Sequence, residues 1–182
     1  MTLGGLDVTI RPARRGDGGA LGRVYVETWR TAYAGMVPDT VLLDMNEGIQ
    51  AARWEGLVER GSDLVKVADD ARHGVVGLAS GGRARRGSDF AAEVFTLYVL
   101  PDAQGAGIGR GLLSGVFRSF RDVGLNSAII WVLAPNPSRF FYEALGGERV
   151  GEREERLWGA DLPEIAYGWR DLDAALDGSL GA

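Results

Sequence analysis

The sequence predicts a mixed α+β fold organised around one β-sheet. Short segments of alternating or β-branched residues are interleaved with longer segments of helical spacing, which is the pattern of a sheet covered by helices. The strongly β-prone segment 93–100 also runs through a glycine-rich loop directly into a long amphipathic helix and then into a buried strand at 128–133. With 182 residues, of which 46% are hydrophobic, the chain is long enough for one well-packed core, so we expect a single domain over residues 1–172.

The first half of the chain is predicted to contain one strand, three helical segments and a pair of strands. Residues 6–11 alternate between apolar and polar side chains and stop at Pro12, as a strand does. Asp17 is a predicted N-cap, and apolar and aromatic residues follow at helical spacing until Gly35. The next segments are helices that start at Pro38 and at Ile49, the second ending at Arg60, and strands at 64–68 and 75–80 joined by a turn at 69–74.

The second half is predicted to alternate strands and helices. Residues 93–100 are rich in β-branched and aromatic side chains and end at Pro101. Residues 173–182 are small and polar, so we expect a flexible tail there. Between them the predicted elements are a helix from 108 to Gly124, a strand at 128–133, a short helix from Pro137 to Leu145 capped by Asn136, and strands at 149–158 and 164–172.

The composition excludes several kinds of active site. Cysteine is absent, so the chain has no thiol nucleophile, no disulfide and no Cys-based metal site. The single histidine, His73, cannot build a multi-histidine metal site, and it lies in a predicted turn. The single lysine, Lys66, lies in a strand segment rather than in the Gly-Lys-Ser/Thr sequence of a phosphate loop. An enzyme of this composition works with carboxylates, tyrosines, hydroxyls, arginines and backbone amides, and we expect no metal.

Charge and hydropathy restrict the partners and the compartment. The formal net charge of −5 argues against a nucleic-acid partner. The first residues lack the basic and apolar regions of a signal peptide, and no stretch approaches 18 uncharged apolar residues. We therefore expect a cytoplasmic protein without a membrane partner.

The loop between the strand 93–100 and the helix that follows is a predicted anion site. The first amides of a helix have no partner within the helix, and the helix dipole places partial positive charge there. Gly105, Gly107 and Gly109 lack side chains, so a phosphate group can approach their backbone closely, and Arg110 adds a full positive charge. The alternative is an ordinary glycine-rich turn. The loop is not the G-x-G-x-x-G fingerprint of a dinucleotide-binding fold. Whether the motif is read from Gly105 or from Gly107, its third glycine is missing.

Four motifs, in order along residues 8–172, resemble those of the GNAT family of N-acetyltransferases. Gln104-x-x-Gly107-x-Gly109 is similar to the family's Q/R-x-x-G-x-G/A acyl-CoA motif. The others are Ile10-Arg11-Pro12-Ala13, which resembles the opening strand; Trp29 to Gly35 with Pro38-Asp39, which resembles the first helix and the turn after it; and Asn136 with Phe141-Tyr142-Glu143-Ala144-Leu145-Gly146, which resembles the late motif. The resemblance implies a mostly antiparallel sheet of about seven strands with one splayed parallel pair, flanked by about four helices.

The resemblance also implies where acetyl-CoA binds. The family holds the pyrophosphate of CoA on the amides of the motif loop, and the pantetheine arm lies like an extra strand beside the central strand. The splayed strands are expected to be 93–100 and 128–133. The implied cofactor-binding residues are Leu97, Tyr98, Val99, Gln104, Gly105, Ala106, Gly107, Ile108, Gly109, Arg110, Asn136 and Phe140.

Three residues are candidates for the chemistry of acetyl transfer. Tyr142 matches the tyrosine that protonates the departing CoA thiolate in many members, the alternative being an aromatic residue at the edge of the core. Glu93 opens the central strand and is the first candidate for a base, the alternative being a solvated strand end. Glu27 on the first helix is the second candidate, the alternative being an exposed helix face. Trp29, Tyr33 and Trp131 are candidates for the acceptor pocket, although aromatic residues at these spacings also form cores.

The expected function is therefore acetyl transfer from acetyl-CoA to a primary amine of a small molecule or peptide. A CoA-binding sensor without turnover, and an acyltransferase with another acyl donor or a hydroxyl acceptor, are the alternatives. Between residues 27 and 60 there are six acids and three arginines, which favours a cationic acceptor but equally fits a solvated helix face. A homodimer is compatible with the resemblance.

Overall fold

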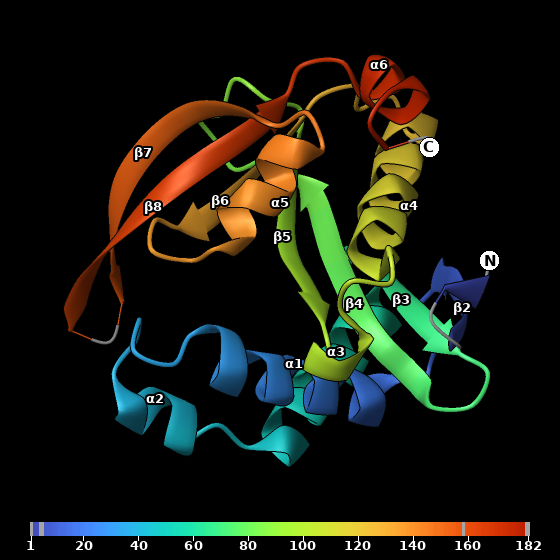
Figure 1. Ribbon diagram of the computed structural model, residues 1–182, viewed down its shortest axis with the longest axis vertical. Coiled ribbons are helices and arrows are strands. Elements are labelled where there is room, and N and C mark those ends of the chain that lie inside the picture. The colour runs from blue at the N-terminus through green and yellow to red at the C-terminus, as the bar shows by residue number, and fades with distance from the viewer. Residues whose placement is uncertain (1, 4–5, 158, 181–182) are drawn as a thin grey trace.

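An eight-stranded sheet runs through the computed structural model, which describes residues 2–3, 6–157 and 159–180 (Figure 1). The strands lie in the order β1-β2-β3-β4-β5-β6-β8-β7. Neighbouring strands are antiparallel except β5 and β6, which are parallel. The strands are β1 (Thr2–Leu3), β2 (Leu6–Pro12), β3 (Leu64–Asp70), β4 (Gly74–Arg83), β5 (Ala92–Val99), β6 (Ala128–Leu133), β7 (Glu148–Leu157) and β8 (Ala160–Trp169).

Helices cover both faces of this sheet. On one face α1 (Gly18–Ala32) packs against β4 and β5, and α3 (Glu47–Arg60) packs on α1; the short α2 (Asp39–Leu43) also contacts α1. On the other face α4 (Ile108–Asp122) packs against β2 to β5, together with α5 (Ser138–Ala144) and α6 (Leu172–Asp177). No helix in the described ranges is long and apolar enough to cross a membrane.

The predicted fold class is confirmed: the structure has a mostly antiparallel sheet with one parallel pair, flanked by helices. The sheet has one more strand than expected because the two-residue β1 pairs with β2. The described residues form six α-helices rather than about four. β4 extends to Arg83, beyond the predicted end at residue 80, because Gly81, Gly82 and Arg83 pair with β5. The predicted strand end at Trp158 lies outside the described residues.

The expectation of a flexible tail over residues 173–182 differs from the structure. Residues 172–177 form α6, whose first amides donate to the carboxylate of Asp171 at 2.9 and 3.1 Å. Leu172, Leu176 and Leu180 follow at four-residue spacing and are all buried. This apolar stripe packs α6 against α4, so the segment belongs to the domain. Residues 181–182 lie outside the described residues.

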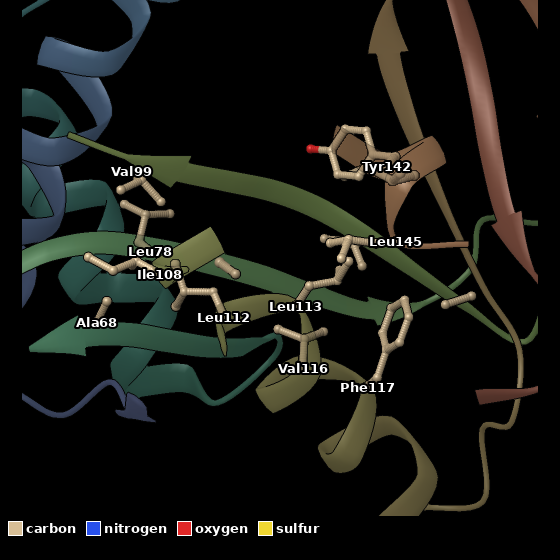
Figure 2. Packing of buried hydrophobic residues seen from close by; sticks show 14 of the residues in the cluster. Ala68, Leu78, Val99, Ile108, Leu112, Leu113, Val116, Phe117, Tyr142 and Leu145 are labelled. Carbon is tan, nitrogen blue, oxygen red and sulfur yellow. The ribbon is translucent and has the colours of Figure 1, made fainter. Parts of the chain in front are cut away.

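A large part of the core lies between α4 and the sheet. α4 directs its apolar face, including Leu112, Leu113, Val116 and Phe117, onto the sheet, and all four side chains are fully buried (Figure 2). Residues of a helix that are three or four apart share one face, which is why the spacing of this stripe predicted the contact. α4 therefore has a fixed position relative to β5, and so does the loop at its N-terminus.

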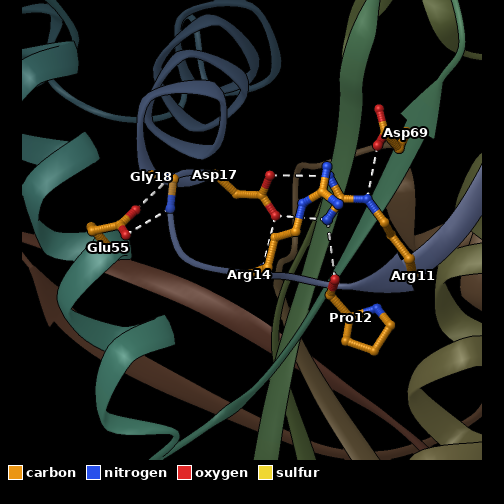
Figure 3. A network of polar contacts seen from close by, with 8 residues as sticks. Arg11, Pro12, Arg14, Asp17, Gly18, Glu55 and Asp69 are labelled. Carbon is orange, nitrogen blue, oxygen red and sulfur yellow. Dashed lines mark hydrogen bonds and ion pairs between the residues drawn. The ribbon is translucent and has the colours of Figure 1, made fainter.

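The start of α1 is held by a network of ion pairs (Figure 3). Arg11 of β2 donates to both carboxylate oxygens of Asp17 at 2.7 and 3.0 Å, and to Asp69 of β3 at 2.8 Å. Asp17 also accepts the backbone N–H of Arg14 at 2.8 Å. The hydrogen bonds from Arg11 lower the pKa of Asp17. The predicted N-cap of α1 is thus present, but its carboxylate holds β2 rather than a helix amide.

A second carboxylate closes the same helix end from α3. Glu55 accepts the backbone N–H groups of Gly16 and Gly18 at 2.8 and 2.9 Å, so α3 neutralises the amides at the α1 N-terminus (Figure 3). The two helices touch at Gly22, where a β-carbon would lie 2.6 Å from the backbone nitrogen of Ala51. Only glycine allows this approach, which fixes α1 tightly between α3 and the sheet.

Replacing Asp17 tests how much this network contributes. Asp17→Ala leaves the partly buried Arg11 guanidinium with one carboxylate and the Arg14 amide without its acceptor, so we expect a loss of roughly 2–4 kcal/mol in the free energy of unfolding at pH 7. The pKa of Asp17 is lowered in the folded state. The ionised Asp17 therefore contributes its full stabilisation at pH values above the pKa of an ordinary carboxyl group, and this contribution to the free energy of unfolding is lost as the pH falls below that pKa.

Chemical denaturation of Asp17→Ala and Asp69→Ala at pH 7 measures the effect. Asp69 contacts the same guanidinium but is more exposed, so its replacement should cost less. An Asp17→Ala protein as stable as the wild type would contradict the assignment.

Candidate functional site

The defining feature of the site is the separation of β5 from β6. The two strands pair only where Ala92–Val94 lies beside Ala128–Ile130, and then diverge (Figure 1). On its other edge β5 stays paired with β4, and the N–H of Leu100 donates to Val76 at 2.9 Å. Successive backbone groups of a strand point to opposite edges, so those of Leu97 and Val99 face the gap.

A β-bulge at Phe95 changes which side chains of β5 share a face. Val94 lies opposite Gly81 and Thr96 opposite Ser80, so Phe95 is an extra residue on β5 without a partner on β4. A bulge of this kind shifts the alternation of side chains by one position. Glu93 therefore does not share a face with Leu97, although their even spacing in the sequence predicts that it does.

Close contacts identify the two faces of β5. A β-carbon on Gly81 would meet the ring of Phe120 of α4 at 2.6 Å, so Val94, its partner, faces α4. A β-carbon on Gly82 would meet the ring of Phe95 at 3.3 Å, which places Phe95 on the opposite face, where α1 lies. Tyr98 also lies on the α1 face. Leu97 lies on the α4 face with Val94.

A cavity of about 640 Å³ occupies the gap between the two strands. Its walls come from both sides of the sheet: α1 on one side, α5 and the start of α4 on the other, and β5 and β6 between them. A cavity walled in this way lets two molecules meet between the strands from opposite faces.

The glycine-rich loop lies at the α4 side of this cavity. The side-chain amide of Gln104 donates to the carbonyl of Val99 at 3.0 Å and so ties the loop to the free edge of β5. Gly105 and Gly107 have φ of 77° and 74°, a region that side-chain-bearing residues rarely adopt. Gly107 is the N-cap of α4, so the amides at Ile108 and beyond are the unpaired donors of a 15-residue helix. This geometry provides the backbone amides that the predicted anion site requires.

Tyr142 of α5 lines the same cavity and is 4% exposed. Its hydroxyl points away from Leu145 and the aliphatic side chains of α4 (Figure 2). Burial, with a smaller contribution from Tyr33, raises the pKa of the Tyr142 phenol well above its ordinary value. The group is therefore a proton donor, rather than a phenolate, at neutral pH.

The α1 side of the cavity is aromatic. Tyr33 and Tyr98 line it, and their hydroxyl oxygens are 3.3 Å apart. Trp29 lies behind them and donates its indole N–H to the Tyr98 oxygen at 3.1 Å. Burial raises the pKa values of both tyrosines, so they remain neutral hydrogen-bonding groups.

Comparison with known proteins decides the family. Residues 44–146 match the acetyltransferase (GNAT) family. The chain is also 34% identical over 168 residues to YuaI of Bacillus subtilis (strain 168), an uncharacterised N-acetyltransferase, over 92% of this chain and 95% of that one. This chain belongs to the GNAT family of acetyltransferases. A mycothiol acetyltransferase of Acidothermus cellulolyticus is 36% identical over 108 residues, which are 58% of this chain and 31% of the relative.

Solved GNAT structures share the fold. An N-acetyltransferase of Staphylococcus aureus Mu50 superposes with a TM-score of 0.72 at 19% identity, over 91% of this chain and 99% of that one. YncA of Salmonella typhimurium, solved with acetyl-CoA, gives 0.67 at 24% identity over 91% and 94% of the two chains. The PaiA N-acetyltransferase of Thermoplasma acidophilum, solved with coenzyme A, gives 0.67 at 20% identity over 87% and 98%.

The cavity brings together most of the residues that the GNAT motifs indicated. Tyr142, Tyr33 and Trp131 line it. Of the twelve residues expected at the cofactor, ten line it as well: Leu97, Tyr98, Val99, Gln104, Gly105, Gly107, Ile108, Gly109, Arg110 and Asn136. Asn136 is buried and accepts the N–H of Ser138 at 2.9 Å, which fixes the start of α5.

Five expected residues lie outside this cavity. Ala106 packs against the core, and Phe140 is 57% exposed, whereas Phe141, one position on, faces the loop and contacts Gly109. Trp29 does not line the cavity but contacts Tyr98, which does. Glu93 is buried against Arg85, and Glu27 lies 3.7 Å from Arg23 and lines a second, separate depression.

Other residues line the cavity without having been expected there. Thr28 and Ala32 come from α1, and Phe95 and Thr96 come from the bulged part of β5. The helical spacing of Trp29 and Tyr33 predicts which aromatic residues of α1 share a face, but it does not predict that Thr28 lines the cavity. No cluster of three or more His, Asp or Glu side chains able to hold a metal ion occurs among the residues that the structure places.

The buried carboxylate of Glu93 makes a testable contribution to stability. Arg85 approaches its Oε1 at 3.2 Å and donates a backbone N–H to Oε2 at 3.4 Å. Arg85→Ala leaves this buried charge without its guanidinium, so we expect a loss of about 1 kcal/mol in the free energy of unfolding, limited by the exposure of Arg85.

Thermal and urea unfolding of Arg85→Ala, beside Arg86→Ala as the control in the same exposed loop, measures this effect. Equal stabilities of the two variants would show that Glu93 does not depend on Arg85.

Proposed function

We propose that this GNAT acetyltransferase moves an acetyl group from acetyl-CoA to a primary amine, by direct attack of the amine within a ternary complex. The observation that carries the proposal is the cavity between β5 and β6, whose walls come from both faces of the sheet. Acetyl-CoA enters from the α4 side and the amine from the α1 side. The complexes of the Salmonella and Thermoplasma proteins with acetyl-CoA and CoA support the choice of cofactor.

In this proposal the α4 N-terminus binds the pyrophosphate. The loop amides from Gln104 to Arg110 and the positive end of the helix dipole offer hydrogen bonds and charge to a phosphate. The backbone groups of Leu97 and Val99 that face the gap pair with the amides of the pantetheine arm, which completes the interrupted edge of β5. The thioester then lies near Tyr142, between the two strands.

The proposed reaction needs only groups that the cavity offers. The neutral amine attacks the thioester carbonyl, and a backbone N–H of β5 stabilises the oxyanion of the tetrahedral intermediate. The new C–N bond forms and the C–S bond breaks. Tyr142 donates its proton to the departing sulfur and regains one from solvent. The extra proton of the amine passes to water, since Glu93 and Glu27 lie outside the cavity beside arginines.

Gly107→Glu tests the pyrophosphate site. The substitution places a carboxylate at the helix N-terminus, where it repels the phosphates, so we expect the Kd for CoA to rise at least about 100-fold. Isothermal titration with CoA measures the change.

Gly124→Glu is the matched control, because Gly124 ends the same helix with φ of 79° and carries the same backbone strain. Only the change at Gly107 should weaken CoA binding. A folded Gly107→Glu protein with wild-type affinity would place the phosphates elsewhere.

Tyr142→Phe tests the proton donor. Loss of the phenol should lower kcat about 100-fold and leave the Kd for CoA unchanged, as measured by release of free thiol. Tyr167→Phe is the control: its hydroxyl donates to Glu143 at 2.6 Å, and Tyr167 is not among the residues that line the cavity.

The raised pKa of Tyr142 adds a second readout. The phenol keeps its proton at pH values above the ordinary pKa of a tyrosine. Loss of this proton should therefore not lower the wild-type rate below about pH 10.

CoA binding with no thiol release over a broad amine panel would instead favour a sensor without turnover.

A further inference from the structure

The α1 side of the cavity presents two aromatic rings at the point where the strands part. Val94 and Ile130 form the last pair of β5 and β6, so Phe95 and Trp131 are the first residues beyond it. Phe95 lies on the α1 face, as its contact with Gly82 shows.

Trp131 lies on the same face. It packs with Ile129, whereas Ile130 is the partner of Val94 and therefore lies on the α4 face. Leu133, two residues further along, packs beside Trp29 and Tyr33 of α1. The two rings therefore border the acceptor end of the cavity from opposite strands.

Phe95 is the more unusual of the two rings. Its side chain is among the large hydrophobic groups that remain exposed, at 36%, although it lines a cavity. An aromatic ring kept in contact with solvent inside a cavity loses its hydration when an apolar group lies against it, which favours binding of such a group.

A hydroxyl without a partner lies on α1 at the same end. Thr28 is 3% exposed and lines the cavity, and its Oγ1 has no hydrogen-bond partner in the structure. A threonine in a helix commonly bonds a carbonyl one turn back, and Thr31 of the same helix does so with Glu27 at 3.1 Å. An unpartnered buried hydroxyl gains from meeting a hydrogen-bonding ligand, so the Thr28 hydroxyl is a candidate partner for one.

No charged side chain is among the described residues that line this end of the cavity. No Asp, Glu or Lys is among the described residues that line it, and Arg110 lies at the phosphate end. Two carboxylates on the α1 face of the sheet are already paired: Glu93 with Arg85 at 3.2 Å and Glu164 with Arg153 at 2.7 Å. Arg153 also lies 4.1 Å from the centre of the Trp131 ring, so a cation already occupies that side of the indole.

The acidic residues between 27 and 60 do not supply the missing charge. Glu55 is bound to the start of α1, Glu59 to Arg15 and Glu27 lies beside Arg23. Three of the six acids in this stretch are thus paired with groups of the protein, and none of the six is among the residues that line the cavity, so the site gives the sequence-based argument for a cationic acceptor no support.

We propose that the acceptor is a primary amine carried on an uncharged aromatic body, which lies between Phe95 and Trp131 while the amine nitrogen donates to the hydroxyl of Thr28. The inference rests on the proposed function and adds the class of substrate to it. Without a carboxylate, the cavity selects the neutral amine, which is the form that attacks a thioester.

Three matched amines test the substrate class with the full-length protein and acetyl-CoA: 2-phenylethylamine, hexylamine and 1,5-diaminopentane. The last two have nearly the same length and differ by a second charge. We expect kcat/KM to be at least about tenfold higher for 2-phenylethylamine than for the diamine, with hexylamine between them. If kcat/KM for the diamine equals that for hexylamine, the proposal that the body of the substrate is uncharged is wrong. If kcat/KM for hexylamine equals that for 2-phenylethylamine, the proposal that the body is aromatic is wrong.

Variants test the residues. Trp131→Ala and Phe95→Ala should raise KM for 2-phenylethylamine about tenfold and reduce its advantage over hexylamine, without changing the Kd for CoA. Thr28→Val should raise KM for each of the three amines, whereas Thr31→Val, which removes a hydroxyl bonded within the helix, should not. An unchanged amine preference in folded Trp131→Ala and Phe95→Ala proteins would overturn the assignment.

Binding measurements separate this inference from the proposed function. If thiol release is absent with all three amines, titration of 2-phenylethylamine into the CoA-saturated protein decides between the two. Binding of 2-phenylethylamine that is lost in Trp131→Ala would support the proposed acceptor site and would contradict the proposed acetyl transfer. No binding at millimolar concentration would contradict the inference, whatever the outcome for CoA.

Discussion

The site depends on a sheet edge in the middle of the molecule. Backbone N–H and C=O groups in a protein interior must find partners, and a central strand normally finds them on both sides. β5 finds them on the β6 side only at 92–94, so the groups beyond remain available inside the fold. The fold tolerates this interruption because β4 pairs with the other edge of β5 on both sides of the bulge, and β8 pairs with the far edge of β6 along its whole length. A cofactor arm with its own amides is the natural complement of such an edge.

The surrounding structure holds this opening in place. α4 is fixed by its buried stripe, and Gln104 ties the glycine loop to Val99, so the helix N-terminus cannot shift relative to β5. On the opposite face, Asp17 and Glu55 hold the start of α1, and the close contact at Gly22 sets its distance from α3. The two walls of the cavity are therefore supported by separate contacts on separate faces.

Local signals in the sequence were sufficient for most of the elements and for the strand–loop–helix arrangement around the glycines. The β-branched run at 93–100, the glycines and the stripe of α4 are adjacent in the chain, so their arrangement follows from short-range rules. The face of the sheet on which Glu93 lies could not be predicted from local sequence, because the bulge at Phe95 depends on how β5 pairs with β4. The choice between Phe140 and Phe141 depended on the phase of a seven-residue helix, which a shift of one residue changes. The capping Asp171 and the leucines after it, by contrast, were readable signals for α6.

The division of the cavity between the two faces has a consequence for how such a chain changes over time. The cavity residues proposed to meet the cofactor are on α4, α5 and the free edge of β5, while Thr28, Phe95 and Trp131 are proposed to meet the acceptor. Substitutions in the second group can alter which amine is accepted and leave the glycine loop and its backbone geometry intact. A lineage with this architecture can therefore acquire new acceptors by small steps, without passing through a form that has lost its acetyl donor.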